Sequence, residues 1–171
     1  MTQPHVTQLA GQIAALSDGK TRRMISIAGA PGSGKSTIVA ELAKRIPGSA
    51  IVPMDGFHQD NDILTARGRL HWKGAPDTFD TGAMLRVLQE VARGGAVSVP
   101  VFDRGADAVV PDGALIPATA DIILVEGNYL LLDTPGWREM HEMWDLTVLL
   151  DVSPDELRRR LVRRWTDHDL T

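Results

Sequence analysis

A glycine-rich stretch near the N-terminus has residue types and spacing that suit phosphate binding. It consists of Gly29, Ala30, Pro31, Gly32, Ser33, Gly34, Lys35 and Ser36, and it fits the P-loop pattern G-x-x-x-x-G-K-[ST]. The glycines let the backbone bend sharply and point its N–H groups at an anion. Lys35 can reach the β- and γ-phosphates of a nucleotide, and Ser36 can bind Mg²⁺. We therefore expect residues 29–37, Thr37 included, to bind ATP.

The residues on either side of this loop support that interpretation. Residues 24–28 form a short apolar, partly β-branched run, which is typical of a buried strand. Residues 37–46 have apolar side chains at helical spacing. A strand, a glycine loop and a helix in this order are the context that a P-loop requires. The remaining alternative is a glycine-rich turn that binds no ligand.

Acidic residues follow two other predicted strands. Asp55 follows residues 50–54, and Glu126 follows the strongly apolar residues 121–125. Ligands of open α/β sheets bind outside the carboxyl ends of the strands, so both carboxylates are candidates for chemistry. An acid at the end of such a strand can bind Mg²⁺ directly or through water; the usual residue is aspartate, and Glu126 is a variant. The alternatives are a surface turn for Asp55 and a structural role for Glu126.

Residues 56–80 form a long connection without clear periodicity. Four basic residues lie close together in it: Arg67, Arg69, His71 and Lys73. The connection also contains Phe57, Trp72 and Phe79, whereas disordered segments are poor in aromatic residues. We therefore expect an ordered substrate-binding loop, suited to an anionic acceptor such as a sugar phosphate or a carboxylate. The alternative is a solvated basic stretch.

An arginine-rich helix is predicted near the C-terminus. Residues 153–156, Ser-Pro-Asp-Glu, have the cap, the early proline and the acidic first turn of a helix start. The helix contains Arg158, Arg159, Arg160, Arg163 and Arg164. We expect Arg158 and Arg159 to lie on a solvated face. The other three suit forked phosphate contacts and could neutralise charge on a phosphoryl group in transfer.

Alternation of predicted strands and helices indicates an α/β fold with a parallel sheet covered on both faces. The expected strands are residues 24–28, 50–54, 96–102, 121–125 and 146–150, five in all, with the P-loop strand at the centre. The expected helices are residues 6–16 within an N-terminal segment 1–20, the P-loop helix, a helix beginning with Thr81 as its N-cap, residues 137–143, and the arginine helix. Residues 105–119 suggest a small hairpin or an excursion from the sheet. At 171 residues the chain is expected to form one domain.

The composition narrows the possible partners. The net charge of −4 gives no basic field of the kind that nucleic-acid-binding proteins show. The absence of cysteine excludes disulfides and thiolate metal sites and fits a cytoplasmic location. No run of residues has the length and apolarity of a membrane span, and the N-terminus does not resemble a secretory signal. We therefore expect a small-molecule partner and neither nucleic acid nor membrane, with a homodimer left open.

Several blocks occur in the order found in one family of kinases. After the P-loop these blocks are residues 54–58 (MDGFH), 73–80 (KGAPDTFD), 102–104 (FDR) and 125–131 (VEGNYLL). Together they resemble the phosphoribulokinase/uridine kinase family of P-loop kinases over residues 22–171. They look closest to a bacterial subgroup that is similar to pantothenate kinases and labelled fructose transport system kinase. The resemblance implies a three-layer α/β/α P-loop NTPase fold with sheet order 2-3-1-4-5.

The resemblance also implies roles for individual residues. Asp55 would be the general base for the acceptor hydroxyl, Arg104 would face the acceptor, and Glu126 would support the metal. Asp77 and Asp80 would anchor the substrate loop, and residues 154–171 would begin a lid over ATP. The expected catalytic residues are Lys35, Asp55, Arg104, Arg160, Arg163 and Arg164. The expected substrate-binding residues are Asp55, His58, Arg69, Lys73, Asp77, Asp80 and Arg104. The expected metal-binding residues are Ser36, Asp55 and Glu126.

The sequence departs from the family pattern at two places. Uridine kinases have an acid that holds the ribose hydroxyls at the position of Gly74, so the resemblance argues against a nucleoside acceptor. Relatives continue beyond the arginine helix through a further helix and usually a short strand, whereas this sequence ends at Thr171. We therefore expect the C-terminal part of the lid to be missing from these residues.

These observations predict an ATP- and Mg²⁺-dependent kinase that phosphorylates a hydroxyl of a small metabolite, such as a sugar. A nucleoside or pantothenate-type kinase is the alternative within the same class. Residues 133–136 (DTPG) mimic the D-x-x-G motif of nucleotide switches, but the sequence has no Asn-Lys-x-Asp motif for reading guanine. A catalytically inactive nucleotide-binding module, attached to a sugar transporter for example, is the other alternative.

Overall fold

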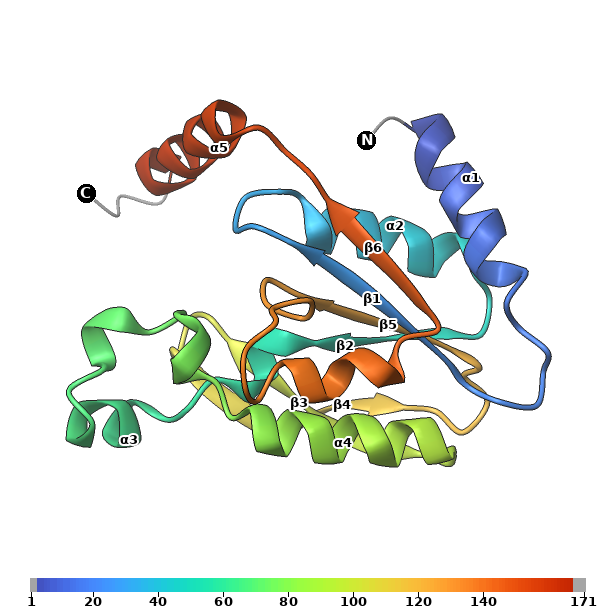
Figure 1. The fold of residues 1–171 in the computed structure, drawn as a ribbon, viewed down its shortest axis with the longest axis horizontal. Coiled ribbons are helices and arrows are strands. Elements are labelled where there is room, and N and C mark those ends of the chain that lie inside the picture. Colours follow the sequence, from blue (N-terminus) through green and yellow to red (C-terminus); the bar gives the residue numbers. More distant parts are fainter. Residues whose placement is uncertain (1–2, 168–171) are drawn as a thin grey trace.

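Four parallel strands form the central sheet of the computed structural model, which describes residues 3–167 without the side chains at positions 3, 4, 164, 165 and 167. The strands are β2 (Ser49–Pro53), β5 (Ile122–Gly127), β1 (Arg23–Gly29) and β6 (Leu146–Leu150), paired in that order (Figure 1). The register places Ala28 beside Gly127 and Gly29 beside Leu150. The carboxyl ends of β5, β1 and β6 therefore meet at one edge of the sheet.

The two inner strands are apolar because both of their faces are covered. Every residue of β1 after Arg23 is buried, and every residue of β5 is buried except Glu126, which is partly buried. Continuous apolar runs of this kind are typical of strands in parallel sheets. In β6, at the edge, exposed and partly buried residues alternate. The predicted strands at residues 24–28, 50–54, 121–125 and 146–150 are confirmed.

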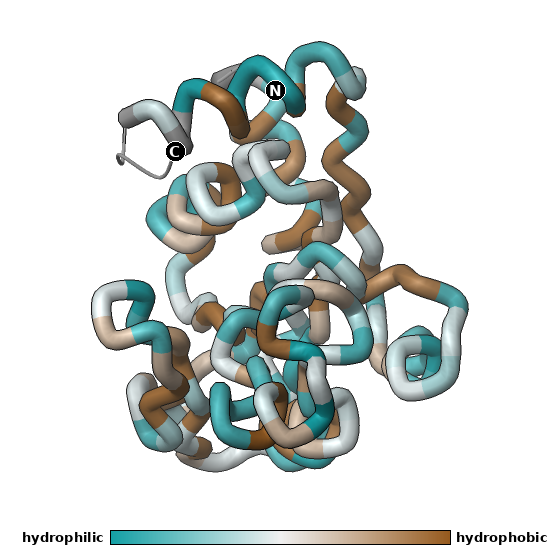
Figure 2. Tube along the Cα trace, turned by 90° about the vertical axis from the view of Figure 1, so that its left-hand side faces the viewer, coloured by the Kyte–Doolittle hydropathy of each residue, from teal (hydrophilic) through white to brown (hydrophobic). Residues whose placement is uncertain are grey.

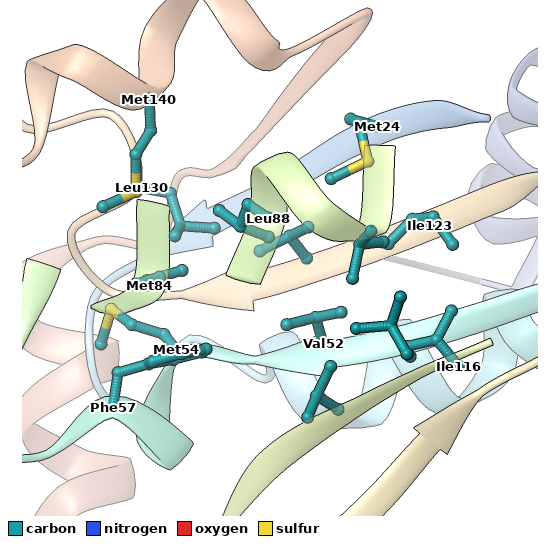
Figure 3. Packing of buried hydrophobic residues seen from close by; sticks show 14 of the residues in the cluster. Met24, Val52, Met54, Phe57, Met84, Leu88, Ile116, Ile123, Leu130 and Met140 are labelled. Carbon is teal, nitrogen blue, oxygen red and sulfur yellow. The ribbon is translucent and has the colours of Figure 1, made fainter. Parts of the chain in front are cut away.

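Helices cover both faces of this sheet and give the three layers that the sequence predicts (Figure 1). On one face, α1 (Gln3–Ala14) and α2 (Lys35–Arg45) bury side chains such as Ile13 and Leu42 against β1 and β5. On the other face lie α4 (Thr81–Arg93) and the 3-10 helix η4 (Arg138–Met143). Figure 3 shows this second core, in which Leu88 of α4 packs over the sheet with Val52 and Ile123.

The prediction of a fifth parallel strand is wrong. Residues 96–102 instead belong to β3 (Val97–Asp103), which pairs antiparallel with β4 (Ala108–Ile116) in a separate two-stranded sheet. Its ladder shifts register between Val99 and Val101, on either side of a proline that has no N–H to donate. Numbering only the parallel strands gives the order 2-3-1-4, which matches the first four positions of the expected order 2-3-1-4-5. Residues 105–119, predicted as a small hairpin or excursion, instead contribute a single strand, β4, which forms a hairpin with β3.

The long connection between β2 and α4 folds into short helical turns. They are η1 (Met54–Phe57), α3 (Asn61–Ala66), η2 (Leu70–Trp72) and η3 (Pro76–Thr78). α4 begins at Thr81, but its N-cap is Asp80 rather than Thr81, because an Asp80 carboxylate oxygen accepts a hydrogen bond from the Ala83 N–H at 2.7 Å. α5 (Pro154–Asp167) begins at the proline, as predicted.

Apolar and polar residues are interspersed along the whole trace (Figure 2). In the part of the chain that the structure describes, no helix has both the length and the apolar character needed to cross a bilayer.

Candidate active site

The P-loop joins β1 to α2 and turns its lysine inward. Gly32 and Gly34 have φ angles of 80° and 92°, a left-handed conformation that glycine adopts without a steric cost. The buried Lys35 ammonium donates to the carbonyl oxygens of Gly29 at 2.8 Å and Ala30 at 3.1 Å. Burial lowers the pKa of Lys35, and the nearby Glu126 and Asp55 charges partly oppose this shift. The loop therefore holds a buried cation whose present partners are neutral carbonyls.

Ser33 offers an independent sign that the loop suits an anion. Its side chain is buried, and its hydroxyl has no hydrogen-bond partner in the structure. A buried polar group without a partner costs free energy, so such groups in native proteins usually have one. A phosphate oxygen in the loop would accept from this hydroxyl, from the backbone N–H groups and from Lys35.

Carboxylate and hydroxyl oxygens gather beside the loop. The Ser36 hydroxyl donates to Glu126 Oε2 at 2.9 Å, where α2 begins next to the end of β5. Burial is the main cause that raises the pKa of Glu126, and the Asp55 charge adds to it. No group of three or more His, Cys, Asp or Glu side chains among the described residues could enclose a metal ion. These oxygens fit Mg²⁺, which takes one or two carboxylates and completes its shell with phosphates and water.

Asp55, in η1 just after β2, lies on the far side of these oxygens from α2. Its Oδ2 is 3.0 Å from the Arg104 guanidinium, which comes from the turn after β3. His58 Nδ1 is 2.7 Å from the Asp55 carbonyl oxygen. Because that carbonyl can only accept, Nδ1 donates the hydrogen bond. The His58 ring also packs on Phe79 and Phe102, with centroids 4.2 and 4.6 Å away, so its orientation is fixed.

These groups face one cavity of about 690 Å³. Its lining includes Pro31, Gly32, Gly34, Lys35, Ser36, Thr37, Met54, Asp55, His58, Gly74, Phe79, Phe102, Arg104, Glu126, Gly127, Asn128 and Arg160. The P-loop forms one part of the wall, and Asp55, His58 and Arg104 form another. A phosphate donor and a small acceptor could therefore meet in the same cavity.

The rest of the predicted substrate residues do not line this cavity. Arg69 pairs with Asp77 at 2.7 Å, and this pairing lowers the pKa of Asp77. Lys73 pairs with Asp107 at 2.8 Å, and Asp80 caps α4. Arg69 and Lys73 are therefore already paired with carboxylates of the protein. Asp77 and Asp80 stabilise the connection between β2 and α4 by contacts within the protein.

α5 brings one of its three candidate arginines to the cavity. Arg160 Nη1 donates to the carbonyl oxygens of Gly32 and Ser33 at 3.3 and 3.2 Å, and its Nε donates to Glu156 at 2.7 Å. Hydrogen bonds from Arg159 and Arg160 lower the pKa of Glu156 to about 2. Arg163 does not line the cavity, and the Arg164 side chain lies outside the described part of the chain.

Asn128 is a site residue to which the sequence interpretation gives no role. Its Oδ1 accepts a hydrogen bond from the Lys35 ammonium at 2.6 Å. The register of the sheet explains its place, because β1 and β5 are parallel neighbours and Ala28 pairs with Gly127. A side chain just past Glu126 therefore reaches the start of the P-loop.

Gly56 packs where η1 touches β3, and a Cβ there would lie 2.2 Å from the Pro100 carbonyl oxygen. Because this obstacle is backbone, we expect Gly56→Ala to lower the free energy of unfolding by about 1–3 kcal/mol and to displace the adjacent Asp55. Urea denaturation measures the loss. Gly11→Ala in α1 is the control, since nothing lies within 4 Å of its added Cβ; it should be neutral or slightly stabilising. Equal stability of the two variants would contradict the tight packing at Gly56.

Comparisons with known proteins agree with this geometry. A family model described as the phosphoribulokinase/uridine kinase family matches residues 24–168. The chain is 34% identical to a Schizosaccharomyces pombe protein provisionally named a uridine kinase, over 84% of this chain and 66% of that protein. It is 33% identical to the pantothenate kinase of Myxococcus xanthus, over 85% of this chain and 50% of that enzyme. The chain thus spans about half to two thirds of the length of these relatives.

A solved structure gives the same answer for the fold. A Silicibacter sp. TM1040 protein, provisionally named a fructose transport system kinase, superposes with a TM-score of 0.92. It is 38% identical, and the match covers all of this chain and 84% of that one. Together with the P-loop and the acidic strand ends, these matches show that the chain belongs to the phosphoribulokinase/uridine kinase family of P-loop kinases.

Proposed function

We propose that this protein is an ATP- and Mg²⁺-dependent kinase that transfers the γ-phosphate to a hydroxyl of a small metabolite, a sugar or sugar-like acceptor. The observation that carries the proposal is the shared cavity, whose wall contains both the Lys35 ammonium and the Asp55 carboxylate. A nucleotide-binding module without catalysis needs the first group but needs no general base for an acceptor hydroxyl.

Each part of the wall has a role in this reaction. Lys35 and the loop N–H groups hold the phosphates, and Asn128 keeps the Lys35 ammonium at the mouth of the loop. Ser36, Glu126 and Asp55 are the residues that would hold Mg²⁺, which neutralises charge between the phosphate oxygens when it is bound. The oxygen of the acceptor hydroxyl bonds to the γ-phosphorus, and ADP leaves. Asp55 accepts the proton that this hydroxyl loses. Positioning and electrostatics supply most of the rate.

The acceptor part of the wall supports a polar acceptor of modest charge. Arg104 is the one Lys or Arg side chain that lines this part among the described residues, because Arg69 and Lys73 are paired elsewhere. The Asp55 carboxylate can accept hydrogen bonds from hydroxyls, His58 adds a polar ring, and the Phe79 and Phe102 rings offer an apolar surface. A hydroxy acid that pairs with Arg104 is the second candidate, in keeping with the similarity to pantothenate kinases. Gly74, without a side chain for ribose hydroxyls, disfavours a nucleoside.

α5 supports a lid over the nucleotide. Arg160 already contacts the P-loop backbone, so a small movement of its guanidinium would bring it to a phosphate. We propose that Arg160 neutralises charge there. Arg163 and Arg164 remain predictions for the same role.

The test is a screen for ATP consumption with sugars, sugar phosphates, hydroxy acids, nucleosides and pantothenate as acceptors. We expect at least one hydroxyl-bearing acceptor to be phosphorylated. ATP binding without transfer to any acceptor, also in a version extended at the C-terminus, would overturn the proposal and favour the inactive module.

Metal removal gives a further prediction. Chelation of Mg²⁺ with excess EDTA should abolish phosphoryl transfer, and added Mg²⁺ should restore it. Ser36→Ala removes one proposed ligand and should raise the Mg²⁺ concentration needed for half-maximal rate, as measured by Mg²⁺ titration at fixed ATP. Thr166→Ala is a matched hydroxyl-removing control, because Thr166 Oγ1 only donates to the Val162 carbonyl within α5. The same Mg²⁺ requirement in Ser36→Ala and Thr166→Ala would exclude Ser36 as a ligand.

A further inference from the structure

Lys73 belongs to a closed cluster outside the main cavity. Its ammonium donates to Asn61 Oδ1 at 2.7 Å and to Asp107 Oδ1 at 2.8 Å, and Asn61 Nδ2 donates to Asp107 Oδ2 at 2.9 Å. Each of the three side chains thus contacts the other two. The ammonium also donates to the Asp107 carbonyl oxygen at 3.0 Å, and only 15% of the Lys73 side chain is exposed. The cluster borders a separate cavity of about 300 Å³.

The cluster joins two segments that are distant in the sequence. Asn61 and Lys73 lie in the connection between β2 and α4, whereas Asp107 lies in the turn between β3 and β4. Asp107 has a φ of 49° and is the single non-glycine residue with a positive φ in the described part of the chain. Residues other than glycine keep this conformation where the surroundings hold it. Lys73 and Asn61 contact Asp107 directly, next to the last pair of the β3–β4 ladder, Asp103 and Ala108.

The same turn carries Arg104, which contacts Asp55 at 3.0 Å. The Arg104 side chain is 60% exposed, so burial does little to fix it, and its place depends on the turn beneath it. Asp103 shapes the near end of the turn by accepting hydrogen bonds from Gly105 and Ala106. Asp107 fixes the far end through Lys73. The Lys73 ammonium also lies 4.9 Å from the ring centroid of Phe102, the residue against which His58 packs.

We propose that Lys73 is a positioning residue: with Asn61 and Asp107 it fastens the β3–β4 turn to the substrate loop and holds Arg104 beside Asp55. This inference rests on the proposed kinase function for its catalytic consequence. Lys73 then affects the acceptor through Arg104 and does not bind the acceptor itself. An acceptor anion could bind Lys73 only if the hydrogen bonds of Lys73 to Asn61 and Asp107 broke. The substrate loop and the turn form one unit around the acceptor.

The first test needs no acceptor. Lys73→Met should speed hydrogen exchange in peptides that contain the Gly105 and Ala106 N–H groups, measured by mass spectrometry. Arg138→Met is a matched control, because Arg138 contacts both the carboxylate and the carbonyl oxygen of Asp133, as Lys73 contacts those of Asp107. Unchanged exchange in Lys73→Met would overturn the fastening role. This result stands even if no acceptor is phosphorylated, which would refute the kinase function alone.

The second test asks whether Lys73 acts through Arg104. With an active acceptor, Lys73→Met and Arg104→Met should each lower kcat/KM for the acceptor on the order of tenfold, within the range of energies found for residues coupled through one network. The KM for ATP should stay the same. The double variant should lose no more than Arg104→Met alone. Losses that multiply would overturn the proposal and place Lys73 in contact with the acceptor.

Discussion

Lys35→Met is expected to lower kcat/KM by about 10²–10³-fold, the usual cost of removing one preorganised donor from a developing anion. Lys35 is the buried cation of the P-loop, and methionine keeps most of the lysine side-chain volume without the charge. ATP affinity, measured by calorimetric titration, should fall as well. A steady-state assay of phosphoryl transfer measures kcat/KM.

Lys44→Met is the matched control for this variant. Lys44 lies on the same helix, but it is largely exposed and pairs with Glu41 at the surface. Surface pairs of this kind contribute little to stability, so Lys44→Met should keep full activity. If Lys35→Met bound ATP and turned over like Lys44→Met, the P-loop would not be the donor site.

Asp55→Asn is expected to lower kcat by about 10²–10⁴-fold, the contribution typical of a general base. The asparagine amide is nearly the same size but cannot accept the hydroxyl proton. ATP affinity measured without Mg²⁺ should change little, because the P-loop backbone and Lys35 keep their contacts with the phosphates. A pre-steady-state measurement with saturating ATP separates the slowed transfer step from nucleotide binding.

Asp112→Asn serves as the control, since Asp112 is exposed on β4 and does not line the main cavity. It should behave as the unmodified protein. A full rate in Asp55→Asn would remove Asp55 from the chemistry and leave the acceptor part of the cavity without a base.

The geometry of the P-loop could be predicted because local sequence determines it. A glycine pattern, a preceding apolar strand and a following helix are contiguous, and the structure places Lys35 and Ser36 accordingly. Glu126 could be predicted for a related reason: acids that follow apolar parallel strands gather at one edge of the sheet. Asn128 needed the register of β1 and β5 as well, which the sequence pattern alone does not reveal.

The acceptor part depends on contacts between distant segments. Residues 96–102 have the composition of a strand, but nothing in them says that they pair with β4 in a second sheet. The basic loop illustrates the same limit. Its cations suggest an anionic acceptor, yet Lys73 meets Asp107, 34 residues further along the chain, and Arg69 meets Asp77. Local charge patterns do not reveal which cations the fold has already paired.

The most direct test of a shared donor and acceptor site is the transfer of labelled γ-phosphate from ATP to an acceptor found in the screen. The protein and its Asp55→Asn variant should be compared at saturating ATP, with both shown to bind the nucleotide. We expect labelled acceptor from the unmodified protein, and almost no labelled acceptor from Asp55→Asn although it still binds ATP. Equal labelling by both proteins, or binding of ATP by both with no labelling, would contradict the account.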